Sequence, residues 1–483
     1  MRSSPRSSKP RREPGDEDLN YSKVTDQILE DLRRIVGPPN VATDADNLRK
    51  YSHDETPLTA GSLPEVVVKP GSTEEVAGVL TLANERNIPV TFRGQGTGLS
   101  CGAVPLLGGI VMSFERMNRI LEIDEENLMA VLESGVVLLD FRQEVEKRGL
   151  FYPADPGERT SSIGGNVATN AGGMNGVRYG KTRDYVLGLE VVLPSGRVMM
   201  LGGKTVKRSM GYDLMHLIIG SEGTLAAVTK VIVKLIKLPK IFMTLYVPFN
   251  DLQSAVSSVC EVLRSRITPT AMEFVERDAI LVAEKHLEKT MPHHDSAAYL
   301  IIRIEGDKED DLYAEAEAIS DICTKNNAVD VLVADTPDSQ ARIWDIRSRF
   351  YEAVVKARVA ELVDAAVPPA RIAQFMKAVK EISKKRGMRI IGYGHAGDGN
   401  IHLHPLKDDL SQERWQELLP EVMKDIYRTA VSFGGTVSGE HGIGSAKKPY
   451  MSIALDEEQM ALMREIKTLF DPKKILNPGK ILD

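Results

Sequence analysis

The sequence predicts an α+β protein of two or three domains. Its 483 residues exceed what one hydrophobic core normally organises. Segments rich in β-branched residues alternate with amphipathic segments of helical period along most of the chain. Glycine is dense in loops up to about residue 240 and thins out afterwards. The chain therefore divides into a glycine-rich part and a second α+β part that covers it.

These changes of composition suggest five segments. The opening residues are rich in Ser, Arg and Pro and lack an apolar run, which excludes a secretory signal, and their acidic residues argue against a transit peptide. The expected segments are a disordered tail over 1–20, a helical segment over 21–60, a glycine-rich domain over 61–240, a second domain over 241–455, and a segment over 456–483 that returns to the first domain.

The glycine-rich domain should begin with a strand, a helix and a second strand. Residues 65–69 are largely β-branched, residues 72–75 match a capping box, and apolar residues then follow at helical spacing. The second strand, residues 89–92, leads into a glycine loop over 93–98. Leu99 stands where a dinucleotide fingerprint has its third glycine, so a Rossmann motif is excluded. The loop can still bring backbone N–H groups close to a pyrophosphate, although an ordinary turn is an equal alternative.

Two further glycine-rich regions favour the phosphate-binding alternative. One of them is residues 153–173, where the hydroxyls of Thr160, Ser161 and Ser162 can cap a short helix whose N-terminus faces a phosphate. The second, residues 220–225, lies between an apolar element and a strand. Three such loops in one domain predict a bound cofactor. The strands expected around them are 186–193, 197–201 and 226–238.

The second domain should alternate strands and amphipathic helices. The expected strands are 242–248, 270–275, 299–304 and 329–334; the expected helices are 252–264, 312–325 and a closing helix over 455–470.

Four of the nine histidines lie in residues 395–404 and 438–442. His402 and His404 should project from one face of a strand, and the glycine-rich turn before them can bring His395 to that face. Two imidazoles and the Glu440 carboxylate could then hold a divalent metal with one position open. The alternative is a metal-free cluster of hydrogen-bonding histidines. Asp398, between glycines, is typical of a turn.

Charge and cysteine content exclude several functions. The formal net charge is −7 and there is no basic stripe interleaved with aromatics, so nucleic acid is not an expected partner. The longest apolar stretch, residues 230–249, contains lysines and prolines and predicts no transmembrane helix. Cys101, Cys260 and Cys323 are too scattered for a disulfide framework or an iron–sulfur cluster. We expect a cytoplasmic protein, with peripheral attachment to the inner membrane through a partner as an alternative.

The order of motifs resembles the FAD-linked 2-hydroxy-acid dehydrogenases, within the vanillyl-alcohol-oxidase flavoprotein superfamily. That family includes the FAD subunit of glycolate oxidase, D-lactate dehydrogenase and D-2-hydroxyglutarate dehydrogenase. The resemblance spans about residues 51–483 and implies a PCMH-type FAD-binding domain of two α+β subdomains, a ferredoxin-like cap and an active site between them. The motifs that carry it are residues 70–75, 93–97, 152–156, 163–166, 221–225, 392–395, 439–444 and 476–480.

The resemblance also implies roles for individual residues. His395, His402 and Glu440 would bind a divalent metal such as zinc, iron or manganese, and His441 would accept the substrate's proton. FAD should be non-covalent, since Thr97 stands where some superfamily members carry a flavin-linked histidine. The implied FAD contacts are Arg93, Gly94, Gly96, Thr97, Gly98, Pro156, Thr160, Ser162, Gly164, Gly165, Asn166, Glu222, Gly223 and Asn477.

For the substrate, the resemblance implies a carboxylate paired with Arg347 and further contacts from His404 and Tyr351. Relatives that use 2-hydroxyglutarate align Thr and Lys with Tyr351 and Leu362. Without that lysine a second carboxylate has no partner, which favours a monocarboxylate such as D-lactate or glycolate.

The resulting hypothesis is FAD-dependent oxidation of a D-2-hydroxy acid to the 2-oxo acid, in a homodimer or hetero-oligomer. Electrons would pass to an iron–sulfur subunit, an electron-transfer flavoprotein, cytochrome c or a quinone. The alternatives are a D-2-hydroxyglutarate dehydrogenase and a redox-neutral, FAD-dependent alkyl-dihydroxyacetone-phosphate synthase. A metal-dependent hydrolase without flavin is disfavoured by the three glycine loops.

Overall fold

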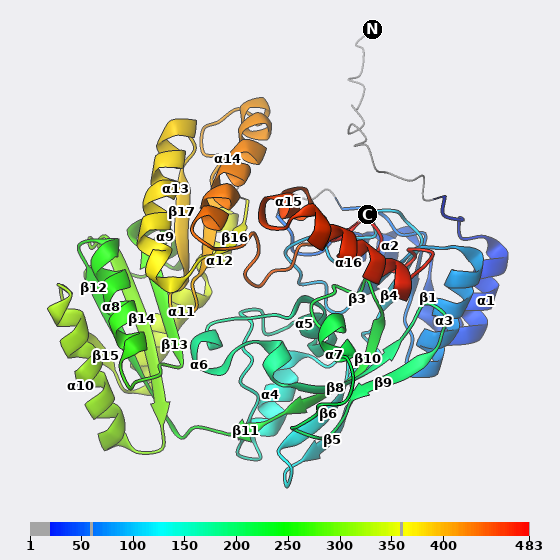
Figure 1. Ribbon diagram of the computed structural model, residues 1–483, viewed down its shortest axis with the longest axis horizontal. Helices are drawn as coiled ribbons and strands as arrows, with labels where there is room; N and C mark the ends of the chain where they lie inside the picture. The colour runs from blue at the N-terminus through cyan, green and yellow to red at the C-terminus, as the bar shows by residue number, and fades with distance from the viewer. Residues whose placement is uncertain (1–19, 58–60, 358–360, 483) are drawn as a thin grey trace.

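The computed structural model describes residues 20–57, 61–357 and 361–482, so nearly all of the predicted tail lies outside the described residues. One large sheet with its helices occupies one side of the molecule, and two smaller sheets together with a two-stranded ribbon occupy the other (Figure 1). The mixture of sheets and helices confirms the predicted α+β class. Among the described residues, no helix combines the length and the apolar character needed to cross a membrane.

The first small sheet has four strands in the order β1-β2-β4-β3, with β2, β4 and β3 parallel. The hydroxyl of Ser72 caps α3 by accepting from the Glu75 N–H at 3.3 Å, while the Glu75 carboxylate accepts from Gly71 N–H. The predicted Ser72 cap is therefore present. The second bond of a capping box, from the N–H of the capping residue to the Glu75 carboxylate, comes instead from Gly71, the residue before the cap. The bounds are β1 (Val41–Ala42), β2 (Val66–Val68), β3 (Val90–Arg93), β4 (Ile110–Ser113), α1 (Asp26–Val36), α2 (Ala45–Lys50) and α3 (Thr73–Arg86).

The second small sheet is antiparallel, in the order β5-β6-β10-β8-β9. The range 226–238, predicted as a single strand, is divided into two strands at Leu235. The backbone N–H of Leu235 donates to Leu128, and the chain then leaves β10 to pair as β11 with β7. The bounds are β5 (Ile120–Asp124), β6 (Met129–Glu133), β7 (Leu150–Phe151), β8 (Val186–Val192), β9 (Val198–Gly202), β10 (Ala227–Lys234), β11 (Ile236–Lys237), α4 (Leu138–Glu146), α5 (Ile163–Thr169), α6 (Gly176–Tyr179) and α7 (Leu214–Ile218).

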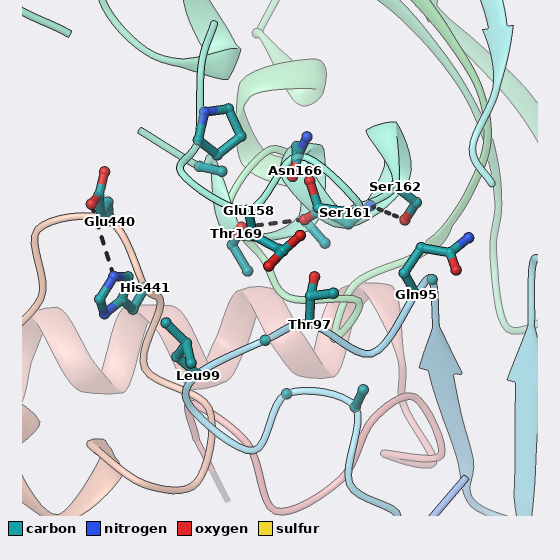
Figure 2. A pocket seen from close by; sticks show the side chains of 18 of the residues that line it. Gln95, Thr97, Leu99, Glu158, Ser161, Ser162, Asn166, Thr169, Glu440 and His441 are labelled. Carbon is teal, nitrogen blue, oxygen red and sulfur yellow. Dashed lines mark hydrogen bonds and ion pairs between the residues drawn. The ribbon is translucent and has the colours of Figure 1, made fainter. Parts of the chain in front are cut away.

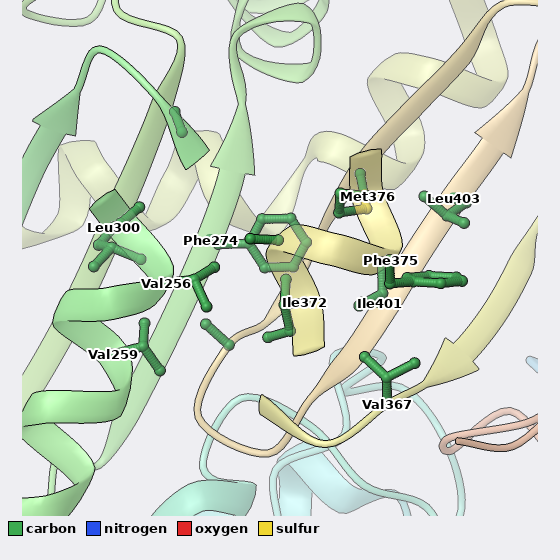
Figure 3. Packing of buried hydrophobic residues seen from close by; sticks show 14 of the residues in the cluster. Val256, Val259, Phe274, Leu300, Val367, Ile372, Phe375, Met376, Ile401 and Leu403 are labelled. Carbon is green, nitrogen blue, oxygen red and sulfur yellow. The ribbon is translucent and has the colours of Figure 1, made fainter. Parts of the chain in front are cut away.

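The large sheet has seven antiparallel strands, in the order β15-β12-β14-β13-β17-β18-β16. One face is apolar and carries Phe274, Ile401 and Leu403, which pack against α8, α10, α13 and α14 (Figure 3). The other face packs against α9, α11 and α12 at its centre. The strand expected over 329–334 is shorter than predicted, because β15 begins only at Leu332.

The elements of the large sheet have the following bounds. The strands are β12 (Ile241–Phe249), β13 (Ala271–Glu276), β14 (Ala298–Gly306), β15 (Leu332–Ala334), β16 (Val363–Ala366), β17 (Ile390–His395) and β18 (Asn400–Pro405). The helices are α8 (Leu252–Arg264), α9 (Arg277–Leu287), α10 (Glu309–Lys325), α11 (Pro337–Ser348), α12 (Phe350–Ala357), α13 (Ile372–Arg386) and α14 (Gln412–Ser432).

The end of the chain lies against the small sheets. After α15 (Met451–Ala454), α16 (Glu457–Phe470) lies over them (Figure 1). The buried ammonium of Lys467 donates to Asp471 and to the carbonyls of Thr224 and Leu476. Leu476 also forms a parallel bridge with Val90 at the start of β3. These contacts hold Asn477 close to the first glycine loop.

Candidate active site between the large sheet and the glycine loops

Four adjacent strands of the large sheet bring polar side chains onto one face. Asp364 on β16 lies opposite His402 on β18, which lies opposite Tyr393 on β17. Glu273 on β13 lies opposite His395 on β17. Directly opposed residues share a face, and side chains alternate along each strand, so all five project to the same side. This side faces the glycine loops rather than the apolar core.

Three atoms that could ligate a metal ion form a small triangle at this face. His395 Nε2 lies 3.2 Å from Glu440 Oε1, His402 Nε2 lies 3.4 Å from the same oxygen, and the two nitrogens are 3.4 Å apart. Ligands about 2.0–2.1 Å from a tetrahedral zinc ion are themselves about 3.3 Å apart. The donor set and its spacing thus fit a divalent metal. All three side chains are largely buried, which limits competition from water.

Glu273 orients the His395 ring through the nitrogen that is not part of the triangle. Its Oε1 lies 2.7 Å from His395 Nδ1, an arrangement that leaves Nε2 free to act as a ligand. Burial would lower the pKa of His395, but the carboxylates of Glu273 and Glu440 raise it well above its usual value. Two buried carboxylates therefore favour a positive charge between them, which either a proton or a metal ion supplies.

The guanidinium of Arg347 lines the cavity but already has a carboxylate partner. Its Nε and Nη2 both donate to Glu273 Oε2, and the planar group also lies 5.1 Å from the centre of the Tyr393 ring. The sequence predicted this arginine as a substrate ligand but did not anticipate Glu273. A substrate carboxylate at Arg347 would share the guanidinium with that glutamate.

Asp364 organises the turn that carries Glu440 and His441. Its Oδ2 accepts the backbone N–H groups of Gly439, Glu440 and His441 at 2.9–3.1 Å, and the ammonium of Lys447 at 3.0 Å. Burial would raise the pKa of Asp364, but His441 and Lys447 hold it well below its usual value. Sequence reasoning missed this residue. Its signal in the sequence is that it is the one charged residue in the otherwise apolar run 362–367, which indicates a buried carboxylate.

His441 stacks on His402, with ring centres 5.1 Å apart and planes within 7°. Its Nδ1 lies 3.8 Å from Asp364 and has no hydrogen-bond partner among the described residues. Burial lowers the pKa of His441 to about 4, although the Asp364 charge opposes that fall. The imidazole is therefore neutral near pH 7 and can accept a proton.

His404 does not reach the cavity. It is fully buried, and its Nε2 lies 3.1 Å from the hydroxyl of Tyr393. Burial lowers the pKa of His404 to about 3, so it stays neutral. Tyr393 and Tyr351 line the cavity instead, and the Tyr351 hydroxyl donates to the Glu55 carbonyl across the cavity mouth. The structure thus places Tyr393 where the sequence predicted His404.

The glycine loops form the opposite wall of the same cavity. In Figure 2, Gln95, Thr97, Ser162 and Asn166 lie across the cavity from Glu440 and His441. All predicted cofactor contacts except Thr160 line it, namely Arg93, Gly94, Gly96, Thr97, Gly98, Pro156, Ser162, Gly164, Gly165, Asn166, Glu222, Gly223 and Asn477. Thr160 is exposed and donates to Glu158.

The glycine-loop wall fits a nucleotide cofactor. Ser162 caps α5 by accepting from Gly165 N–H at 3.2 Å, as predicted, so the helix N-terminus is directed at the cavity. A Cβ on Gly94 would lie 2.0 Å from Ser162 Oγ, so the loop packs this closely only with glycine. Ser161 Oγ and Asn166 Nδ2 are buried, line the cavity and have no partner among the described residues. Such atoms are suited to bind a polar ligand.

Two family models match the chain. Residues 64–202 match the FAD binding domain model, and residues 238–481 match the model of the C-terminal domain of FAD linked oxidases. The first match contains two of the glycine-rich regions, and the second contains every residue of the histidine cluster.

Curated relatives match over nearly the whole chain. A D-lactate dehydrogenase of Archaeoglobus fulgidus is 43% identical, covering 94% of this chain and 99% of the relative. A D-lactate dehydrogenase of Anaerostipes hadrus is 40% identical, covering 96% and 99%. A glycolate oxidase subunit of Bacillus subtilis is 39% identical, covering 95% and 97%.

Solved structures share the fold at low identity. A p-cresol methylhydroxylase matches with a TM-score of 0.79 at 18% identity, covering 94% of this chain and 96% of that structure. An alkyldihydroxyacetonephosphate synthase matches with a TM-score of 0.74 at 19% identity, covering 96% and 87%.

Replacing Gly94 should weaken flavin binding. In Gly94→Ala the new Cβ would overlap Ser162 Oγ, and the displaced loop should raise the FAD dissociation constant about 10- to 100-fold. Fluorescence titration of the apoprotein with FAD measures this. Gly306→Ala is the control, because its Cβ would make an ordinary 3.4 Å contact with Leu312 outside the cavity. Unchanged FAD affinity in Gly94→Ala would contradict the placement of the cofactor.

Proposed function

The chain belongs to the FAD-linked oxidases, and from that premise we propose that it oxidises a D-2-hydroxy acid to the corresponding 2-oxo acid. One observation supports the proposal most: the ligand triangle of His395, His402 and Glu440 and the neutral imidazole of His441 lie on one wall of the cavity that the FAD loops complete. Oxidation of an α-hydroxy acid needs both walls of the cavity. The histidine wall would bind and deprotonate the substrate, and the flavin held by the other wall would accept its hydride.

The histidine wall accounts for binding and deprotonation. When bound, a divalent metal would polarise the substrate hydroxyl and FAD would supply the hydride acceptor. His395, His402 and Glu440 would hold zinc, iron or manganese, leaving one side of the triangle open to the cavity. His441 would accept the hydroxyl proton, and the nearby Asp364 carboxylate would stabilise the resulting imidazolium.

The charges of the cavity favour a short monocarboxylate. Of the described residues that line it, Arg93 and Arg347 are the arginines, none is a lysine, and Arg93 belongs to the flavin loop. Arg347 would therefore bind the single substrate carboxylate. Leu362, Tyr351 and Tyr393 occupy the remaining wall and provide no cation for a second carboxylate. D-lactate and glycolate fit this arrangement better than D-2-hydroxyglutarate.

Electrons must leave the reduced flavin for an acceptor outside this chain. The three cysteines are free, and none of them belongs to a group of potential metal ligands among the described residues. An iron–sulfur subunit, an electron-transfer flavoprotein, cytochrome c or a quinone would serve, in a homodimer or a hetero-oligomer. Redox-neutral synthase chemistry on this fold would need a phosphate site, and no observation at the substrate wall favours one.

Anaerobic reduction of the flavin tests the proposed function. Stoichiometric D-lactate or glycolate should bleach the flavin absorption of the purified protein, and D-2-hydroxyglutarate should do so at least about tenfold more slowly for lack of a second cation. Bleaching by D-2-hydroxyglutarate alone would refute the monocarboxylate assignment. If no member of a 2-hydroxy-acid panel reduced the flavin, the proposed reaction would be wrong.

Replacing His441 should separate chemistry from flavin binding. His441→Gln removes the proton acceptor but keeps the turn, so flavin reduction should slow about 10²- to 10⁴-fold while FAD remains bound. Stopped-flow absorbance under anaerobic conditions gives the rate constant. His294→Gln, at a half-exposed histidine distant in sequence and outside the cavity, is the control. A reduction rate near that of the wild type would exclude His441 as the base.

A further inference from the structure

Two flavin-side loops hold the turn that follows His441. The hydroxyl of Ser100, just after the first glycine loop in the connection between β3 and β4, donates to the His441 carbonyl at 3.0 Å and to the Gly442 carbonyl at 3.3 Å. The Ser100 carbonyl in turn accepts from Ser445 N–H at 3.1 Å. The backbone on both sides of Ile443 is thus tied to the loop that borders the flavin cavity.

Glu222 makes the second connection. Its Oε1 accepts from Ile443 N–H at 2.7 Å and its Oε2 accepts from Gly444 N–H at 2.8 Å. The residue is 6% exposed and adopts a left-handed backbone with φ 51°. Both carboxylate oxygens are therefore occupied by the turn. The sequence predicted Glu222 as an FAD contact, but this side chain is directed at the other half of the site.

The turn and Glu222 are closely matched in shape. Gly442 has φ +79°, and a Cβ there would lie 2.9 Å from Glu222 Oε1. Burial raises the pKa of Glu222, while the N–H groups of Ile443 and Gly444 and the charges of Lys447 and Lys480 act in the opposite direction. Each oxygen nevertheless faces a donor, so the geometry requires two acceptors at this position.

The backbone of Glu222 is fixed on the flavin side. Its N–H donates to the Ala168 carbonyl of α5 at 2.8 Å, and its carbonyl accepts from Asn477 Nδ2 at 2.7 Å. The same Asn477 amide group also donates to the Gly102 carbonyl, which follows the first glycine loop in the connection between β3 and β4. Glu222 thus connects the helix whose N-terminus faces the cofactor cavity to the turn that carries the proposed base.

We propose that Glu222, assisted by Ser100, is a positioning residue that sets the placement of His441 relative to the flavin. The inference rests on the proposed function, since it concerns the alignment of proton acceptor and hydride acceptor. Asp364 shapes the turn from the sheet side, and Glu222 aligns the turn with the cofactor side. Loss of Glu222 should therefore leave the FAD loops and the ligand triangle intact but shift His441 relative to the substrate.

Glu222→Gln tests this directly. The amide places an N–H donor against one of the two backbone N–H groups, so one bond is lost and the turn is repelled. Anaerobic flavin reduction should slow about 10- to 100-fold, because small displacements of reacting groups cost that much. The primary deuterium isotope effect with C2-deuterated substrate should not fall, and FAD affinity should stay within about threefold.

A second readout does not depend on turnover. Hydrogen exchange of the 441–446 segment in the FAD-loaded protein should quicken in Glu222→Gln, since one of the two backbone amides bonded to Glu222 loses its acceptor and the turn is held less firmly. Glu190→Gln is the matched control. Glu190 is a largely buried carboxylate of the flavin side too, bonded to Thr229 and Lys230, but it has no contact with the turn. This control should leave exchange of the segment and flavin reduction unchanged.

The outcomes separate the two claims. Wild-type exchange and wild-type reduction in Glu222→Gln would overturn the positioning role. Weakened FAD binding with normal reduction at saturating FAD would also overturn it and would restore Glu222 as a cofactor contact. If the wild-type protein were reduced by no 2-hydroxy acid, the proposed function would fail, while faster exchange would still support the structural connection. Should Glu222→Gln not fold, Ser100→Ala should give the same pattern with about threefold to tenfold slower reduction.

Discussion

The buried carboxylate of Asp364 is the constraint on which the rest of the site depends. An isolated buried carboxylate costs several kcal/mol of desolvation, so it persists only where donors surround it. Here the donors are three consecutive backbone N–H groups, the Lys447 ammonium, the Asn400 amide and the Ser438 hydroxyl. Satisfying this one charge fixes the turn that carries Glu440 and His441. Strand pairing places His402 directly opposite the same residue, so Asp364 helps to position both a proposed metal ligand and the turn of the proposed base His441.

The two halves of the site use different structural means. Histidines on paired strands have positions set by register, which suits a ligand triangle whose atoms are 3.2–3.4 Å apart. The opposite wall is made of loops whose glycines allow the backbone to approach a cofactor closely, as at Gly94. Glu222 and Ser100 connect the two walls, so the relative placement of base and flavin need not rely on domain packing alone.

Sequence reasoning recovered those features whose signal is local. Glycine-dense loops, the Ser162 cap and the clustered histidines each lie within a short segment, and the motifs that unite them identified the family. Asp364, Glu273 and Tyr393 were missed, because their importance arises from strand register between segments far apart in the chain. The same reason explains why His404 was expected in the cavity. Its spacing from His402 correctly placed it on the same face of the strand, but Tyr393 on the neighbouring strand lies between it and the cavity. Arg347 was chosen without its partner Glu273, and no local pattern reveals that pair.

The most direct test of this account is to measure metal content and anaerobic flavin reduction together in Asp364→Asn. The amide cannot accept all the donors that surround the carboxylate, so the turn should lose its fixed shape. The account predicts normal FAD content, about 10- to 100-fold weaker metal binding and a matching loss of flavin reduction by the 2-hydroxy acid. Full metal occupancy with wild-type reduction would contradict the view that this buried charge organises the site.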